Sequence, residues 1–199
     1  MNNDFYQAIE GRRSIYSISR EMTISDERLE KNLWRILKTM PSPMNSQSAR
    51  ILLLLNHHHD RFWDITLEAL RKIVSEERFP ATEKKIAGFA AGRGTILFFD
   101  DQEVIAGLQN KYPTYRDTFP VWGQQANAML QYAVWTGLAE EGYGASLQHY
   151  TELVEDDVRK EWDLPESWQL IAQMPFGKKT APAGEKAIEP MEKRFLVRK

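Results

Sequence analysis

A run of five aliphatic residues at positions 51–55 constrains the fold of this chain more than any other feature. The run is too short for an isolated helix, and it lacks the polar–apolar alternation of a strand with one face in water. It therefore predicts a central strand that is buried on both faces. A second apolar run at residues 94–99 predicts another buried strand, which ends at Asp100 and Asp101.

Apolar residues at helical spacing surround these strands. The first expected helix begins near Phe5 and ends at Gly11, and the second follows Ser25 as its N-cap. Further helices are expected at about residues 60–75, 82–91 (with Thr82 as its cap), 102–111, 120–141 and around 158–162, and a further strand at 168–174. This order predicts one domain, residues 1–199, with an α+β fold in which helices flank a mixed central sheet.

The expected helix at residues 120–141 is the longest, and apolar residues cover most of its surface. A helix that is apolar on most sides is buried on most sides. In a chain of 199 residues, we expect part of this burial to be against a second subunit. A short apolar segment, residues 195–197, follows a connection that contains Pro182, Gly184 and Pro190.

Composition excludes several classes of protein. The chain has no cysteine, which excludes structural disulfides, thiolate catalysis and zinc–thiolate sites. Its net charge is −2, which gives no reason to expect a nucleic acid or an anionic membrane as partner. No apolar run approaches the roughly 20 residues of a membrane span, and the N-terminal residues lack the features of a signal peptide. We therefore expect a cytoplasmic protein.

Three short segments point to a nucleotide-like cofactor. The first segment is Arg12, Arg13 and Ser14, whose guanidiniums and hydroxyl suit a phosphate. The second segment, residues 41–47, carries two amides, which donate and accept at once and so suit the edge of a heterocycle. The third segment, residues 144–150, reads as a turn of small residues that ends in polar donors.

Each segment has another interpretation when it is taken alone. Arg12 and Arg13 could be solvated charges at a helix C-terminus, where cations are favoured. Asn45 could nucleate a turn, and His149 could be a hydrogen-bonded structural histidine.

Together and in this order, the segments resemble the FMN-dependent nitroreductase family, and most closely its short branch in fungi and Gram-positive bacteria. The resemblance rests on six ordered segments between about Phe5 and Gly177, namely residues 12–16, 41–47, 94–99, 129–135, 147–150 and 165–177. It implies an intertwined homodimer with two FMN sites at its interface. It also implies that residues 180–199 pack on the partner subunit.

The resemblance implies a role for each segment. The first segment matches phosphate and ribityl contacts, and the second matches a segment that reaches the flavin from the partner subunit. The third lies under the isoalloxazine ring, where the backbone N–H of His149 would point at flavin N5. Members of the family often have an acidic residue at the position of His149, and this chain does not. The implied FMN contacts are Arg12, Arg13, Ser14, Ser42, Asn45, Gln47, Leu147, Gln148 and His149, with Lys178 or Lys179 completing the phosphate site.

Two other sets of residues invite a functional interpretation. Phe119 and Trp122, at the start of the long helix, are candidates to line a substrate pocket. The three histidines at residues 57–59 are expected to form an exposed loop after the first strand. Adjacent histidines do not converge on one ion, so we expect no metal site.

The implied function is that of an NAD(P)H-dependent FMN oxidoreductase. NADH or NADPH would give a hydride to flavin N5, and a nitroaromatic or quinone would then accept it in a ping-pong cycle. The chain lacks a Gly-x-Gly-x-x-Gly fingerprint, which agrees with transient binding of the nicotinamide. The alternative is an FMN-binding stress-response or regulatory protein with little turnover, and a weaker third reading is a metal-responsive protein that uses the histidines.

Overall fold

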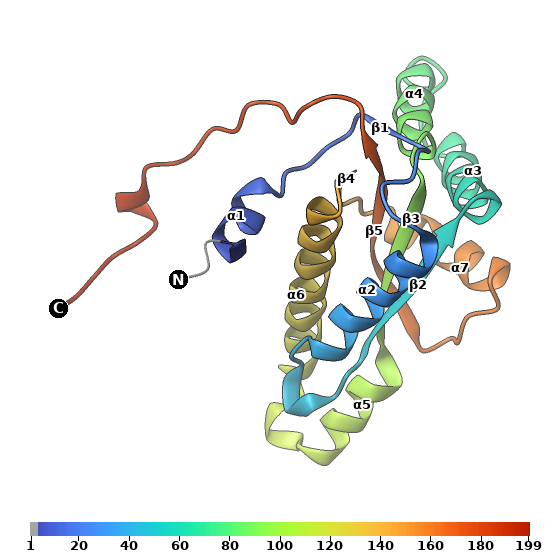
Figure 1. Cartoon of the computed structure of the whole chain (residues 1–199). Helices are drawn as coiled ribbons and strands as arrows, with labels where there is room; N and C mark the ends of the chain where they lie inside the picture. The colour runs from blue at the N-terminus through green and yellow to red at the C-terminus, as the bar shows by residue number, and fades with distance from the viewer. Residues whose placement is uncertain (1–3) are drawn as a thin grey trace.

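A five-stranded sheet forms the centre of the protein (Figure 1). The structure is a computed structural model that describes residues 4–199; residues 1–3, which belong to the N-terminal stretch without signal-peptide features, lie outside this range. Strand order is β1-β5-β3-β2, with β4 paired to β5. The strands are β1 (Ile18–Ser19), β2 (Ala49–Leu55), β3 (Gly94–Asp101), β4 (Tyr143–Ala145) and β5 (Trp168–Lys179).

Strand β2 lies at an edge of the sheet, so the prediction that it is central was wrong. Its residues pair with β3, with Leu54 opposite Thr95, and its other edge is unpaired within residues 4–199. The fully buried strand is β3, which lies between β2 and β5. The expected burial on both faces was also wrong, since only Leu54 of β2 is buried and its other residues are half-buried. An aliphatic run shows that a strand is apolar, and it carries no information about neighbours at the strand's edges.

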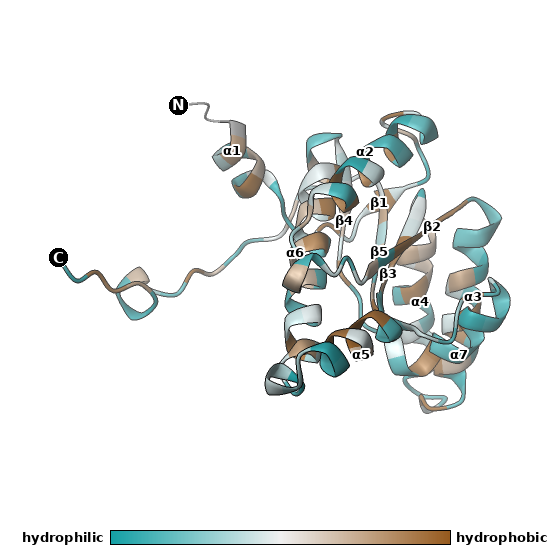
Figure 2. Cartoon of the chain, turned by 90° about the horizontal axis from the view of Figure 1, so that it is seen from below, coloured by the Kyte–Doolittle hydropathy of each residue, from teal (hydrophilic) through white to brown (hydrophobic). Residues whose placement is uncertain are grey.

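Helices cover both faces of the sheet, which confirms the α+β class. Side chains of β3 alternate, with Leu97 and Phe99 in one core cluster and Ile96 and Phe98 in the other. The first cluster lies under α3 (His57–Arg71), α4 (Phe79–Ala90) and α7 (Thr151–Glu161), and the second lies under α2 (Asp26–Thr39) and α6 (Phe119–Glu140), as Figure 2 shows from below. All the named strands pair antiparallel, so the sheet is antiparallel and not mixed as expected. The parallel pairing of Ser14 with Ala145 is an isolated bridge outside these strands.

Helix boundaries follow the local sequence in most places. Ser25 caps α2, since its hydroxyl accepts a hydrogen bond from the Arg28 N–H at 3.3 Å. Helices α5 (Gln102–Lys111) and α6 match their expected spans within a residue. Helix α4 begins before Thr82, because Pro80 lies in its first turn, where a missing N–H costs nothing.

The tail that follows β5 extends away from the body of the protein and contains a 3-10 turn at Met191–Lys193 (Figure 1). The N-terminal helix, α1 (Asp4–Gly11), contacts α6. The tail exposes 67% of Phe195 and 72% of Leu196. Helix α6 also exposes Met129 and Tyr132. This amount of bare apolar surface is unusual for a chain that acts alone.

Gly177 offers a test of the strand packing. A Cβ at Gly177 would overlap the carbonyl oxygen of Ser19 and lie 3.1 Å from the backbone nitrogen of Arg93. Gly177→Ala should therefore lower the free energy of unfolding by about 1–3 kcal/mol. In the control, a Cβ at Gly107 in α5 would meet no heavy atom within 4 Å. Gly107→Ala should raise the free energy of unfolding by about 0.5–1 kcal/mol. Urea denaturation measures both, and equal stability of the two variants would contradict this packing.

Candidate functional site

The guanidinium of Arg12 lies over two aromatic rings of α6. Its central carbon lies 4.3 Å from the centre of the Trp135 ring and 5.7 Å from that of Tyr132. Such cation–π contacts fix the orientation of the planar cation. The Arg12 Nε is buried and has no hydrogen-bond partner within the described chain. An oriented guanidinium with an unpaired donor is suited to binding an anion.

The first segment lies beside β4. The backbone N–H of Ile15 donates to the carbonyl of Ala145 at 2.9 Å, and the Trp135 indole N–H donates to the same oxygen at 3.2 Å. Ser14 forms a parallel bridge with Ala145. The structure therefore brings the first and third segments together, although they are far apart in the sequence.

A hollow of about 440 Å³ opens at the first segment. Arg13 donates to the carbonyl of Gly184 at 2.6 Å, so the start of the tail forms one wall. Three cationic side chains and one carboxylate make the lining net positive. The lining residues are Arg12, Arg13, Ser14, Tyr16, Gly184, Glu185 and Lys186.

A second hollow, of about 330 Å³, adjoins the first because Tyr16 lines both. Two lysines of α4, Lys84 and Lys85, also line it. The Lys85 ammonium also lies 5.8 Å from the centre of the Tyr150 ring, so this lysine connects the wall of the hollow with the end of the third segment. Sequence reasoning missed these lysines, because lysines on the polar side of a helix look like solvated charge.

The third segment is extended along β5 and is not the expected turn. After β4, the N–H of Ser146 donates to the Pro175 carbonyl at 3.3 Å, and the N–H of Gln148 donates to the Gln173 carbonyl at 2.7 Å. The Gln148 carbonyl in turn accepts from the Gln173 N–H at 2.9 Å.

This pairing sets the direction of the His149 N–H. The Gln148 carbonyl and the His149 N–H belong to one planar trans peptide, in which they point in opposite directions. Because that carbonyl points at β5, the His149 N–H points away from β5. It lies on the edge where the Ala145 carbonyl meets Ile15. Within residues 4–199 the His149 N–H forms no hydrogen bond.

The side chains of the third segment differ in exposure. Gln148 is buried and donates from Nε2 to the Ser146 hydroxyl at 3.1 Å, so its side chain is engaged inside the protein. Leu147 packs partly against the core cluster under α6. The imidazole of His149 is exposed. The backbone therefore offers this segment's best-defined donor.

The two lysines at the end of β5 face different surroundings. Lys178 forms an ion pair with Glu21 at 2.5 Å. Lys179 lies beside Gly144, where its Cγ would be 3.0 Å from an added Cβ. Gly144 also touches Ile15, which follows the first segment. The geometry thus favours Lys179 over Lys178 as the cation that accompanies Arg12.

The second segment lies at another part of α6. Met44, Asn45 and Gln47 all have positive φ angles of 51–53°, and the Ser42 hydroxyl closes the loop by accepting from the Gln47 N–H at 2.9 Å. Ser42 and Gln47 line a hollow of about 460 Å³ together with Ala126 of α6.

Within one chain, the second segment does not lie next to Arg12. Ala126 and Trp135 are nine residues apart on α6, which corresponds to about 14 Å along the helix axis. The exposed side chains of Asn45 and Gln47 have room to meet a group from outside the chain.

Trp122 and Phe119, the two aromatic residues expected to line a substrate pocket, differ in exposure. Trp122 lines a hollow of about 370 Å³ with Met44 and Met129. Phe119 is completely buried and packs against Tyr115 and Trp122, so it presents no surface to a substrate.

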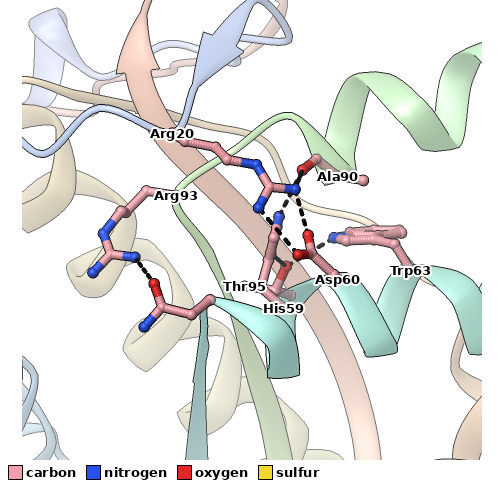
Figure 3. Close-up of polar contacts among 8 residues, drawn as sticks. Arg20, His59, Asp60, Trp63, Ala90, Arg93 and Thr95 are labelled. Atoms are coloured by element: carbon pink, nitrogen blue, oxygen red, sulfur yellow. Dashed lines mark hydrogen bonds and ion pairs between the residues drawn. The ribbon is translucent and has the colours of Figure 1, made fainter.

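The three histidines form the first turn of α3, so the expected loop was wrong, whereas the expected exposure is found for His57 and His58. Figure 3 shows the third histidine, His59, beside Ala90 and Thr95. His59 is fully buried, with Nε2 3.2 Å from the Ala90 carbonyl and Nδ1 2.8 Å from the Thr95 hydroxyl. A carbonyl only accepts, so Nε2 carries the proton and Nδ1 accepts from Thr95. The Trp63 indole donates to the same hydroxyl at 2.9 Å.

Among the described residues, no group of three or more His, Cys, Asp or Glu side chains is placed so that it could hold a metal ion. Burial lowers the pKa of His59 to about 4, although the Ala90 hydrogen bond and the charge of Asp60 act to raise it. His58 accepts a hydrogen bond from the Trp162 indole at 3.2 Å.

No described helix is long and apolar enough to cross a bilayer.

Comparison with known proteins gives consistent matches over nearly the whole chain. The model of the nitroreductase family matches residues 9–178. HBN1 of Saccharomyces cerevisiae is 30% identical over 186 residues, which are 92% of this chain and 91% of HBN1.

Solved structures give the same result. The nitroreductase CinD from Lactococcus lactis, in complexes with chloramphenicol, 4-nitrophenol and nicotinic acid, matches with TM-scores of 0.91, 0.89 and 0.86 at 40–41% identity, over 98% of this chain and 100% of CinD. A nitroreductase with bound FMN from Desulfitobacterium hafniense shares the fold at 17% identity, with a TM-score of 0.73 and 100% coverage of both chains.

Buried His59 predicts a loss of stability in acid. Its folded pKa of about 4 lies below the ordinary value of 6.5, so the unfolded chain binds the extra proton as the pH falls between these values. Lowering the pH from 7 to 4.5 should remove about 2 kcal/mol through this residue. His59→Gln lacks this titration, so the difference in unfolding free energy between the two proteins should shrink by that amount. Parallel pH profiles in urea denaturation would contradict the assignment.

Proposed function

The chain belongs to the nitroreductase family and is an oxidoreductase, and we propose that it uses FMN to pass hydride from NADH or NADPH to nitroaromatic or quinone acceptors. The observation that carries this proposal is the unpaired backbone N–H of His149 on the edge of the third segment that Ile15 meets. A cation, Arg12, lies over the ring of Trp135, whose indole donates to the Ala145 carbonyl on that same edge. A flavin mononucleotide has matching ends, a phosphate and a ring that accepts a hydrogen bond at N5.

The residues present fit FMN in charge and in donor type. The orphaned Nε of Arg12 and the net positive hollow suit a phosphate. Ser14 and Lys179 would add a hydroxyl and a second cation. FMN, when bound, would supply the chemistry by accepting a hydride at N5 and passing it on. Tyr16, Lys84 and Lys85 line the adjoining hollow, which would take part of the ring system.

The protein's own contribution is position and electrostatics. The His149 N–H is a fixed dipole whose direction is set before any ligand arrives, so it needs no reorganisation on binding. No side-chain acid or base is assigned to the reaction. Lys85 would place positive charge beside the ring, where negative charge develops on reduction.

We also propose that the protein is a homodimer. The exposed apolar residues of α6, the unpaired edge of β2 and the apolar tail would then be covered by a second copy. In that assembly Ser42, Asn45 and Gln47 would reach the partner's cofactor, and Trp122 would line the acceptor space. Residues 180–199 would pack on the partner subunit. Cytoplasmic location stays a prediction from the sequence.

Similar proteins support the class of substrate. CinD has been captured with 4-nitrophenol and with nicotinic acid. The first is a nitroaromatic, and the second carries the same pyridine ring as a nicotinamide. We propose that this chain takes both classes in turn over one flavin face. Nothing in the described chain favours the metal-responsive reading, because His58 and His59 are bonded to other side chains.

A direct assay tests the proposed function. Purified protein should bind FMN in titrations and should then oxidise NADH or NADPH when 4-nitrophenol or a quinone is present, in parallel-line ping-pong kinetics. Protein that binds no flavin would contradict the proposal. Protein that binds FMN but oxidises neither nicotinamide would favour the stress-response or regulatory alternative.

Arg12→Ala should weaken FMN binding more than it alters turnover. Loss of a charge-assisted contact to phosphate should cost about 1.5–3 kcal/mol, or about 10- to 150-fold in affinity. At saturating FMN, turnover should largely recover. Lys178→Ala is the matched control, since its ammonium is paired with Glu21, and it should change the affinity little. Tight FMN binding with lost turnover in Arg12→Ala would instead place this residue in the acceptor chemistry.

His149→Ala should keep FMN and most of the activity, because the proposed donor is the backbone N–H. A change in acceptor range is expected, since the exposed imidazole borders the site. If the imidazole were a proton donor, its loss would slow flavin reoxidation by about 10²- to 10⁴-fold. Stopped-flow measurement of reoxidation distinguishes the two roles.

A further inference from the structure

Gln173, in β5, attaches both neighbours of His149 to the sheet. Its backbone exchanges two hydrogen bonds with Gln148, at 2.7 and 2.9 Å. Its side-chain Oε1 accepts from the backbone N–H of Tyr150 at 2.7 Å. One residue therefore holds the residue before His149 and the residue after it.

These bonds fix the two peptide planes that flank His149. The bond from the Gln173 N–H to the Gln148 carbonyl holds the plane that carries the His149 N–H. The bond from Tyr150 to Oε1 holds the plane that carries the His149 carbonyl. Any residue except proline at position 173 could make the backbone bonds, whereas the bond to Tyr150 needs an acceptor at the reach of a glutamine.

The surroundings of Gln173 make this role specific. Its side chain is completely buried, and its Nε2 has no hydrogen-bond partner within the described chain. A buried unpaired amide is unfavourable, so an apolar side chain would suit the core better if the Tyr150 N–H needed no partner. The Gln173 side chain thus stabilises the third segment through its Oε1, while its own NH₂ group stays without a partner in the described chain.

We propose that Gln173 is a positioning residue, which locks the peptide planes on both sides of His149 and so aims the His149 N–H at the flavin. The flavin part of this proposal rests on the proposed function, whereas the lock on the backbone does not. A purely structural role, in starting α7 after Tyr150, would affect folding but not the properties of the bound flavin.

The test compares three substitutions with a matched control. Gln173→Met keeps the volume and loses the acceptor, Gln173→Asn keeps the amide but shortens its reach, and Gln173→Glu keeps an acceptor oxygen at the same reach. Gln131→Met is the control, because Gln131 is also a buried glutamine and its amide donates to Asn127 on the same helix. Each protein is examined by amide hydrogen exchange without FMN, and by spectra, midpoint potential and stopped-flow reduction with FMN.

The proposed positioning role predicts a specific pattern of amide exchange and flavin properties among the variants. Amide exchange at Tyr150 should speed up in the Met and Asn variants and stay slow in Gln173→Glu and in Gln131→Met. With FMN bound, the Met and Asn variants should show a shifted flavin spectrum, a lower midpoint potential and about 10- to 100-fold slower reduction by NADH or NADPH. Gln173→Glu should recover most of the rate. If Gln173→Met does not fold, Gln173→Asn carries the same comparison.

Other outcomes overturn the proposal. Unchanged exchange at Tyr150 in the Asn variant would show that no lock exists. Altered exchange with an unchanged spectrum, potential and rate would reduce Gln173 to a structural residue, as would an equal loss in Gln131→Met. If the unsubstituted protein binds no FMN, the proposed function fails and the positioning role fails with it, while the exchange data still decide whether the lock exists.

Discussion

The antiparallel pairing of the third segment with β5 is the interaction on which the rest of the site depends. It places the Ala145 carbonyl where Ile15 and Trp135 both donate to it, and so brings Arg12 to the sheet. It also turns the Gln148 carbonyl toward β5, which directs the His149 N–H outward. Strand β5 and the proposed donor to FMN are therefore parts of one hydrogen-bonded ladder.

This arrangement suits chemistry that a cofactor carries out. A flavin needs a protein that holds its phosphate, covers its ring and places fixed dipoles near the atoms that change charge. Arg12 is oriented by stacking on Trp135, and His149 is oriented by the sheet. Neither depends on a flexible side chain finding its place after binding. The second segment lies at another part of α6, and the proposed homodimer would bring the partner's copy to complete the site.

Much of the fold could be predicted from the sequence, because β3, α2, α5 and α6 carry strong periodicity or clear caps. The edge position of β2 could not be predicted, since periodicity reports faces and not neighbours. Strands β1 and β4 are too short to show a pattern. The burial of His59 was missed because three adjacent histidines look polar, whereas only the third faces the core. In the site, sequence motifs pointed to the arginines and to His149, but Lys85 and Gln173 acquire meaning only through what they contact in three dimensions.

The most direct measurement is a crystal structure of the protein with FMN bound. We expect the backbone nitrogen of His149 to lie roughly 3 Å from flavin N5, as a hydrogen bond requires. We also expect the phosphate to meet Arg12 and Lys179 in the hollow beside the first segment. A flavin whose N5 faces another group, or whose phosphate binds elsewhere, would contradict the account.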